Sequence, residues 1–156
     1  MARLTLKYPD AHLIIVGDGP ERAALERFAQ IRQPEGNVIF TGALTHPETL
    51  AVIESADVFV MNSTYEGLSH LLIEAMSLAR PIVATHVGGN PELLTDRESA
   101  LLIPLDQPEL LPERMLELLE NKILATQLGQ RAKERSADFS IKRMVDTTSL
   151  FFRQSV

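Results

Sequence analysis

Residues 62–76, NSTYEGLSHLLIEAM, are the stretch that decides the fold of this chain. The apolar run DVFVM at 57–61 comes just before them and is typical of a short buried strand. Gly67 then marks a tight turn, and the residues after it have the composition of the first turns of a helix. A strand, a loop and a helix in this order present backbone N–H groups at the carboxyl end of a parallel sheet, where α/β proteins bind anions. The stretch therefore predicts a strand–turn–helix unit with an anion-binding loop.

Apolar runs alternate with helix-forming segments along the rest of the chain. We expect strands at residues 12–16, 38–40, 57–61, 80–85 and 100–103. We expect helices at 2–8, 20–31, 45–55, 69–78, 91–94, 109–121 and 122–152, the last with a break near 138–140. Short links between strands and helices produce parallel βαβ units with right-handed crossovers. The predicted fold class is therefore α/β, with a doubly wound, parallel, Rossmann-like sheet.

The composition is that of a soluble globular protein and excludes several classes of function. A net charge of −6 and a pI near 5.2 argue against non-specific nucleic-acid binding, which needs a basic surface. No apolar run approaches the roughly 20 residues of a transmembrane helix, and the N-terminus lacks the apolar core of a signal peptide. The absence of cysteine excludes disulfides, and the 4 histidines show no metal-ligand spacing. We expect a cytoplasmic protein without metal or cofactor, with one domain at 1–138 and a helical tail at 139–156.

The loop GDGP at residues 17–20 follows one expected strand and opens a helix, a position that suggests contact with a phosphate or a nucleotide. It is not the dinucleotide fingerprint, because the third glycine of G-x-G-x-x-G would fall at Arg22, and it lacks the lysine of a P-loop. Taken alone, a tight turn before a proline at the start of a helix is the preferred interpretation.

Glu66 and Glu74 bracket the glycine turn and form the most informative polar pair. In a helix that begins near Ser69, successive residues rotate by about 100°. That rotation turns an apolar arc toward the sheet, namely Leu71, Leu72, Ala75, Met76 and Ala79. It places three polar residues on the opposite side, namely His70, Glu74 and Ser77. Two carboxylates beside backbone donors suit a polyhydroxylated ligand that carries phosphate. The alternative is a solvent-exposed Glu74 that the helix dipole stabilises.

A third glycine turn, Gly88 and Gly89, follows the strand expected at 80–85. Glycine there either lets the backbone approach a ligand closely or only serves the link into the next helix. Three such turns would line one rim of the sheet. The serines, histidines and aspartates of the chain show no Ser/His/Asp arrangement, so we predict no nucleophile.

Several motifs occur in a set order: LIIVGDGP at 13–20, VIFTG at 38–42, ADVFV at 56–60, EG at 66–67 with EAM at 74–76, PIVAT at 81–85 and GG at 88–89. Together they resemble the carboxy-terminal domain of retaining nucleotide-sugar glycosyltransferases of the GT-B fold, glycosyltransferase family 4. The resemblance runs from about residue 4 to about residue 138, which is nearly the whole chain. Phe139 and Ser140 begin a tail similar to the closing helices of that family.

The resemblance implies a donor site for a nucleotide diphosphate sugar. Glu66 would contact hydroxyls of the transferred sugar as the catalytic carboxylate, and Glu74 would bind the ribose hydroxyls. Backbone N–H groups of the turn and the first helical residues would meet the sugar and the diphosphate: Gly67, Leu68, Ser69, His70 and Leu71. The base and nucleoside would lie against Gly17, Gly19, Thr41 and Gly42. The family needs no metal, because basic side chains and amides neutralise the diphosphate.

The resemblance also implies parts that this sequence lacks. Family members carry an amino-terminal Rossmann-like domain, which supplies much of the acceptor site and a histidine important for catalysis. Their carboxy-terminal domain begins with a central strand, between the equivalents of 12–16 and 57–61, and with a loop whose Arg and Lys grip the diphosphate. Loss of that strand would leave two unpaired sheet edges. We hypothesise that these edges pair with each other or with another chain, such as the missing domain or a second copy in a homodimer.

The predicted function is that of the donor-binding domain of a retaining glycosyltransferase, which moves a sugar from a nucleotide diphosphate sugar to an acceptor hydroxyl. We expect the chain alone to transfer no sugar, because the basic clamp and the acceptor domain are absent. The alternative is a non-catalytic sugar-nucleotide-binding or protein-interaction module, and a GT-B epimerase relative is a weaker third. Family members often act at the inner membrane face, so a peripheral location there is an expectation for the full enzyme. The sequence does not indicate the base, the sugar or the acceptor.

Overall fold

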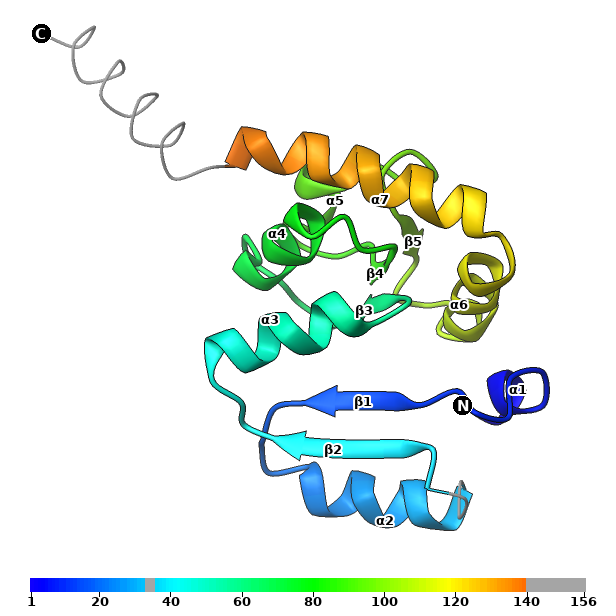
Figure 1. The fold of residues 1–156 in the computed structure, drawn as a ribbon. Coiled ribbons are helices and arrows are strands. Elements are labelled where there is room, and N and C mark those ends of the chain that lie inside the picture. Colours follow the sequence, from blue (N-terminus) through cyan, green and yellow to red (C-terminus); the bar gives the residue numbers. More distant parts are fainter. Residues whose placement is uncertain (33–35, 140–156) are drawn as a thin grey trace, which may run out of the picture. The chain divides into compact units, whose positions relative to one another are not determined.

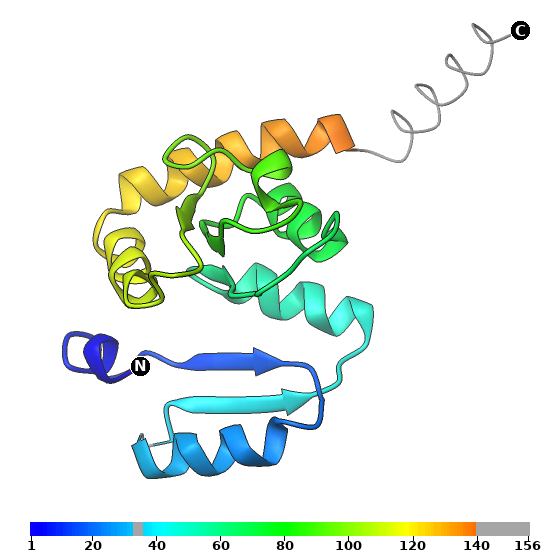
Figure 2. The same ribbon diagram turned by 180° about the vertical axis from the view of Figure 1, so that it is seen from behind.

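The computed structural model describes residues 1–32 and 36–139 of the chain. The chain divides into two compact units, Met1–Val52 and the part from Ile53 onward. Each unit contains its own parallel sheet, as Figures 1 and 2 show from opposite sides. The fold class is therefore α/β with parallel strands, as predicted.

The first unit is built on two parallel strands that lie side by side, β1 (Leu13–Val16) and β2 (Val38–Gly42). A short helix, α1 (Ala2–Thr5), comes before the pair. A longer helix, α2 (Arg22–Arg32), connects the two strands. The chain then continues into α3 (His46–Ser55). The predicted order of strand, helix and strand is confirmed here, with ends that differ by one to two residues.

Asn37 fixes the point at which both strands of the first unit begin. Its buried side chain donates from Nδ2 to the carbonyl of Pro9 at 3.0 Å and to that of Ala11 at 3.1 Å. Its own carbonyl accepts from the N–H of Leu13 at 2.8 Å. A single amide residue therefore joins the turn before β1 to the start of β2.

Helix α2 exposes three large apolar residues that lie three residues apart. Leu25 is 48% exposed, Phe28 61% and Ile31 78%. Within the described part of the chain, α2 buries none of its residues. The helix also begins at Arg22 rather than at Pro20, because the Arg22 N–H donates to the carbonyl of Gly19 at 3.1 Å and closes a turn first.

The second unit contains a three-stranded parallel sheet in the order β3-β4-β5. Its strands are β3 (Phe59–Met61), β4 (Ile82–Thr85) and β5 (Leu101–Ile103). Its helices are α4 (His70–Ser77), α5 (Asn90–Leu93), α6 (Leu110–Glu120) and α7 (Lys122–Ser136), with a closing 3-10 turn η1 (Ala137–Phe139). Both views show α7 lying along α4, and the two helices pack together. The short helix expected at 91–94 and the strand expected at 100–103 are confirmed within one residue.

Successive side chains of the central strand β4 face two different apolar clusters. Ile82 packs in one cluster with Leu72 of α4. Val83 packs in the other with Leu118 of α6 and Leu128 of α7. All of β4 is buried, which explains why it is a continuous apolar run rather than an alternating one. The helices therefore cover both faces of this sheet, which is the doubly wound arrangement.

Two strands begin two residues later than the sequence predicted. The strands expected at 57–61 and 80–85 start at Phe59 and Ile82. The carbonyl of Pro81 accepts from the N–H of Phe59 at 2.9 Å. Proline has no N–H of its own, so it cannot extend the ladder in the other direction.

The five strands form a pair and a triplet rather than one continuous sheet. Among the described residues, β1 has β2 as its one strand partner, and β3 has β4. Both strands therefore lie at sheet edges, as the resemblance predicted for the two that flank a missing central strand. No described helix is long and apolar enough to cross a membrane. The domain boundaries at 138 and 139 stay a prediction, and the tail from 140 to 156 lies outside the described residues.

Candidate functional site

The loop between β3 and α4 carries most of the predicted site residues. Ser69 caps the helix, because its Oγ accepts from the N–H of Leu72 at 3.4 Å. The helix itself starts at His70, in agreement with a predicted start near Ser69. The first N–H groups of a helix have no acceptor inside it, and the helix dipole adds positive potential there. The segment from 67 to 71 therefore ends a loop and begins a helix where an anion would be stabilised.

Glu66 is held at both its side chain and its main chain. Oγ of Ser63 donates to Oε1 of Glu66 at 2.6 Å. The carbonyl of Glu66 accepts from the N–H of Gly89 at 3.1 Å. The side chain is half-buried, so one part of it reaches solvent. The carboxylate therefore has a defined position before any ligand binds.

Gly88 and Gly89 are glycines because the loop of Glu66 lies against them. A Cβ at Gly88 would overlap the carbonyl oxygen of Glu66, and a Cβ at Gly89 would overlap that of Gly67. Gly88 also has φ +50, in the left-handed region that favours glycine. In the structure the group that approaches this turn is the Glu66–Gly67 peptide, and close approach to a ligand stays a prediction.

The apolar arc of α4 is narrower than the sequence predicted. Leu72, Ala75 and Met76 are buried as expected, but Leu71 is 37% exposed. Leu71 lies about 100° around the helix from Leu72, which is enough to leave the covered face. Ala79 comes after the helix end and has φ +53.

The polar side of α4 is closer to the prediction than its apolar arc is. His70 and Ser77 are exposed, and Glu74 between them is half-buried. Oγ of Ser77 donates back to the carbonyl of Glu74 at 2.7 Å. Glu74 therefore stands on the second turn of the helix whose start carries the capped loop.

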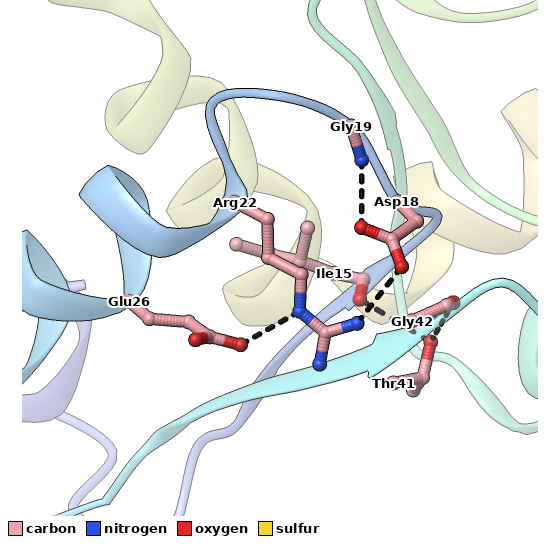
Figure 3. Close-up of polar contacts among 7 residues, drawn as sticks. All are labelled: Ile15, Asp18, Gly19, Arg22, Glu26, Thr41 and Gly42. Carbon is pink, nitrogen blue, oxygen red and sulfur yellow. Dashed lines mark hydrogen bonds and ion pairs between the residues drawn. The ribbon is translucent and has the colours of Figure 1, made fainter.

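The four predicted site residues of the first unit, Gly17, Gly19, Thr41 and Gly42, lie at or just beyond the carboxyl ends of β1 and β2. Figure 3 shows Gly19, Thr41 and Gly42. The N–H of Gly17 donates to the carbonyl of Gly42 at 2.9 Å, and both glycines have positive φ, +122 and +73. Oγ1 of Thr41 donates to the same carbonyl at 2.9 Å. The N–H of Gly19 donates to Oδ1 of Asp18 at 2.8 Å.

Arg22 also lies against the loops at the ends of β1 and β2, and the sequence analysis did not predict it as a residue of this site. Its Nε donates to Oε1 of Glu26 at 2.7 Å, and Nη1 lies 3.3 Å from Oδ2 of Asp18, as Figure 3 shows. A Cβ at Gly42 would come 2.6 Å from Nη1, so the guanidinium lies directly against that glycine. The hydrogen bond to Glu26 raises the pKa of Arg22, and the charge of Asp18 adds to it. The spacing of Asp18, Arg22 and Glu26, four residues each, was the signal that could have found this group.

The chemistry available at these loops is hydrogen bonding and charge stabilisation. Within residues 1–32 and 36–139, no group of three or more His, Cys, Asp or Glu side chains is placed to hold a metal. His12 bonds locally through Nδ1 to the carbonyl of Asp10 at 2.8 Å. Carboxylates can accept from hydroxyl groups, and backbone N–H groups can donate to phosphate oxygens.

A parallel α/β protein whose polar loops follow the carboxyl ends of its strands belongs to the broad class of Rossmann-like ligand-binding proteins. Comparison with known proteins narrows this class. The family described as "Glycosyl transferases group 1" matches residues 1–135. The chain belongs to this family, and its structure matches those of GT-B glycosyltransferases. The family and the GT-B fold that the sequence resemblance implied are therefore confirmed, and the retaining mechanism stays a prediction.

Three relatives illustrate the likeness. Alpha-D-kanosaminyltransferase of Streptomyces kanamyceticus is 27% identical over 154 residues, which cover 98% of this chain and 40% of that protein. The structure of sucrose-phosphate synthase from Thermosynechococcus elongatus matches with a TM-score of 0.82 and 28% identity, over 92% of this chain and 38% of that one. Anabaena HepE, solved in complex with UDP and glucose, matches in fold with a TM-score of 0.82 and 19% identity, over 95% of this chain and 41% of that one. The chain spans about 40% of the length of these relatives.

Proposed function

We propose that this chain binds the nucleotide diphosphate sugar used as donor by a retaining glycosyltransferase. The observation that carries the proposal is the fixed carboxylate of Glu66, held by Ser63 and Gly89 directly before the capped start of α4. A carboxylate accepts hydrogen bonds from sugar hydroxyls, and helix N–H groups bind phosphate oxygens. Membership of the family and the UDP and glucose in the complex of the Anabaena neighbour support it.

We propose that different residues contact different parts of the donor. Glu66 contacts the sugar hydroxyls and Glu74 the ribose hydroxyls. The N–H groups of Gly67, Leu68, Ser69, His70 and Leu71 meet the sugar and the diphosphate. For the first unit we propose that Gly17, Gly19, Thr41 and Gly42 contact the nucleoside. Charge stabilisation of the diphosphate in this chain is proposed to come from the backbone N–H groups at the start of α4, so no metal enters the proposal.

Transfer to an acceptor is proposed for the whole protein rather than for these 156 residues alone. The relatives are longer, and this chain spans about 40% of their length. We expect the 156-residue chain to bind the donor and to release no glycosylated product when acceptors are added. Sustained turnover by the purified chain would overturn this part. The cytoplasmic location stays a prediction.

The edge strands allow a further, separate proposal about partners. β1 and β3 each have one strand partner among the described residues, so the other edge of each has no strand partner there. We propose that either a further domain or another chain pairs there, the other chain being a second copy in a homodimer. Sedimentation of the purified chain across concentrations tests this, and a strictly monomeric state with no added partner would contradict the homodimer.

Calorimetric titration of the chain with UDP-glucose, GDP-mannose and ADP-glucose tests donor binding. We expect one of them to bind, with the base that fits the nucleoside loops. Glu74→Ala and Glu66→Gln should each weaken binding by about 10- to 100-fold, because a hydrogen bond to a charged group contributes about 1.5–3 kcal/mol. Glu98→Gln is the matched control, since Glu98 is an exposed glutamate of the same unit outside the loop.

The outcomes distinguish a donor-binding site from a protein-interaction module. Binding that Glu74→Ala weakens and Glu98→Gln leaves unchanged supports a donor site. Equal weakening by both variants would mean that the effect is a general one of charge. Binding of none of the three nucleotide sugars would overturn the proposal and favour a protein-interaction module.

A further inference from the structure

A short series of hydrogen bonds runs from the end of β4 to the carboxylate of Glu66. Thr85 is the last residue of the strand and is 2% exposed. Its Oγ1 donates to the carbonyl of Ser63 at 2.7 Å and accepts from the N–H of Ser63 at 3.2 Å. Oγ of Ser63 then donates to Oε1 of Glu66 at 2.6 Å. One buried hydroxyl therefore holds both backbone groups of the residue that holds the carboxylate.

We infer that Thr85 and Ser63 are positioning residues, which set the direction in which Glu66 presents its carboxylate to the donor sugar. The inference rests on the proposed function, because it assigns a cause to the placement of a residue proposed to contact that sugar.

The position of Thr85 explains why a side chain, rather than the backbone of β4, holds Ser63. The ladder between β3 and β4 ends with Met61 opposite Ala84. Beyond that pair the loop of residues 62–69 leaves the sheet, and backbone pairing with β4 stops. The hydroxyl of Thr85 supplies the next two hydrogen bonds in place of a backbone ladder. The loop therefore keeps a defined geometry for two residues past the end of its strand.

Thr85 is itself fixed by the segment that follows it. Asn90 is fully buried, and its Nδ2 donates to the carbonyl of Thr85 at 2.9 Å. Gly89, next to Asn90, donates its N–H to the carbonyl of Glu66 at 3.1 Å. The segment from 85 to 90 thus holds Glu66 by its main chain directly and by its carboxylate through Ser63.

This arrangement affects sugar binding more than nucleotide binding. Ser63 engages one carboxylate oxygen and restricts the rotation of the Glu66 side chain, so the other oxygen has a set direction. A glutamate that is already ordered loses less conformational entropy when it accepts a sugar hydroxyl. The nucleoside and the diphosphate are proposed to use other groups, and they gain nothing from an ordered Glu66.

The test compares each nucleotide sugar with its own nucleoside diphosphate: UDP-glucose with UDP, GDP-mannose with GDP and ADP-glucose with ADP. Thr85→Val keeps the shape of the side chain and removes the hydroxyl, and Ser63→Ala removes the donor to Glu66. Both should lower the affinity for the nucleotide sugar about 10-fold and change the affinity for the diphosphate by less than about 2-fold. Thr85→Ser keeps the hydroxyl and should restore the parent ratio.

Two results overturn the inference while leaving the proposed function intact. One is an unchanged affinity ratio in Thr85→Val and Ser63→Ala. The other is an equal loss for sugar nucleotide and diphosphate, which would indicate general damage to the unit. If the unmutated chain binds none of the six compounds, the proposed function fails and the positioning role fails with it.

Proton NMR of the Glu66 side chain tests the geometry without any ligand. When the carboxylate is held, the shifts of the two protons on Cγ of Glu66 differ more than in a freely rotating side chain. We expect the difference to become smaller in Ser63→Ala and Thr85→Val, and amide exchange at Ser63 to accelerate only in Thr85→Val. A difference that is the same in the parent protein and in both variants would overturn the inference.

Discussion

Gly89→Ala tests the packing of the two loops that hold Glu66. The backbone of Gly89 has φ −77 and ψ −9, an ordinary right-handed conformation that alanine adopts without strain. A Cβ there would nevertheless overlap the carbonyl oxygen of Gly67. Gly67 supplies the matched control, since a Cβ at that position meets nothing within 4 Å and its φ is not in the left-handed region. The two variants add the same methyl group on opposite sides of one contact.

The expected magnitudes follow from two opposing effects. Replacing glycine by alanine in a compatible conformation stabilises a protein by about 0.4–1 kcal/mol, because the unfolded chain loses conformational freedom. Forcing a methyl group into a filled space costs about 1–3 kcal/mol. We expect Gly67→Ala to be slightly more stable than the parent and Gly89→Ala to be less stable than Gly67→Ala by about 2 kcal/mol. For a chain of this length that difference corresponds to about 4–8 °C in Tm.

Thermal unfolding followed by circular dichroism measures both variants. Gly89→Ala should also weaken binding of the nucleotide sugar, since relief of the overlap moves the main chain that carries Glu66. Equal melting temperatures for Gly67→Ala and Gly89→Ala would refute the close packing of the two loops. A loss of stability in Gly67→Ala as large as that in Gly89→Ala would refute it as well, because Gly67 has room for the methyl group.

Three further predictions concern groups outside this contact. Asn37→Ala removes two hydrogen bonds of a buried amide, so we expect a loss of about 2 kcal/mol in urea unfolding, with faster amide exchange at Leu13; unchanged exchange would contradict it. Burial raises the pKa of Glu117, but hydrogen bonds from two arginines outweigh burial and hold it below its ordinary value of 4.5. A lowered carboxyl pKa contributes stability above that value that is lost as the pH falls, so Glu117→Gln should be less stable than the parent at neutral pH and equal to it in acid; a constant gap across pH would count against this. Arg22→Gln removes the ion pair with Glu26, and the resulting fall in Tm should shrink in high salt, because exposed pairs are screened; a fall that does not depend on salt would indicate lost packing instead.

Local signals account for most of the fold. β4 could be predicted because a strand buried on both faces is a continuous apolar run. The start of α3 could be predicted from capping-box spacing, and the carboxylate of Glu48 indeed accepts from the N–H of Thr45 at 2.8 Å and from its Oγ1 at 2.6 Å. These hydrogen bonds also lower the pKa of Glu48. In each case the signal lies within the element that it predicts or directly next to it.

The contacts that build the site had weaker signals. The group of Asp18, Arg22 and Glu26 has helical spacing, and opposite charges four residues apart are a signal that the sequence itself carries. Thr85 gave no such signal, because threonine at the end of a strand is ordinary on β propensity alone. Its partner Ser63 is 22 residues away in the sequence. The pair Gly88 and Gly89 likewise indicates that another group lies close to the backbone there, without indicating which group it is.

The two glutamates of residues 62–76 therefore owe their positions to different causes. Glu74 stands within α4, so its place follows from the helix, and the helix is set by the cap at Ser69 and by the apolar residues beneath it. Glu66 lies in a loop, and its place follows from Thr85 and Gly89, which belong to a distant segment. Under the proposed roles, changes in the segment from 85 to 90 should alter the choice of sugar while the ribose contact stays in place. Changes in the core face of α4 should move Glu74 with the helix and weaken binding of the nucleoside diphosphate whether or not it carries a sugar.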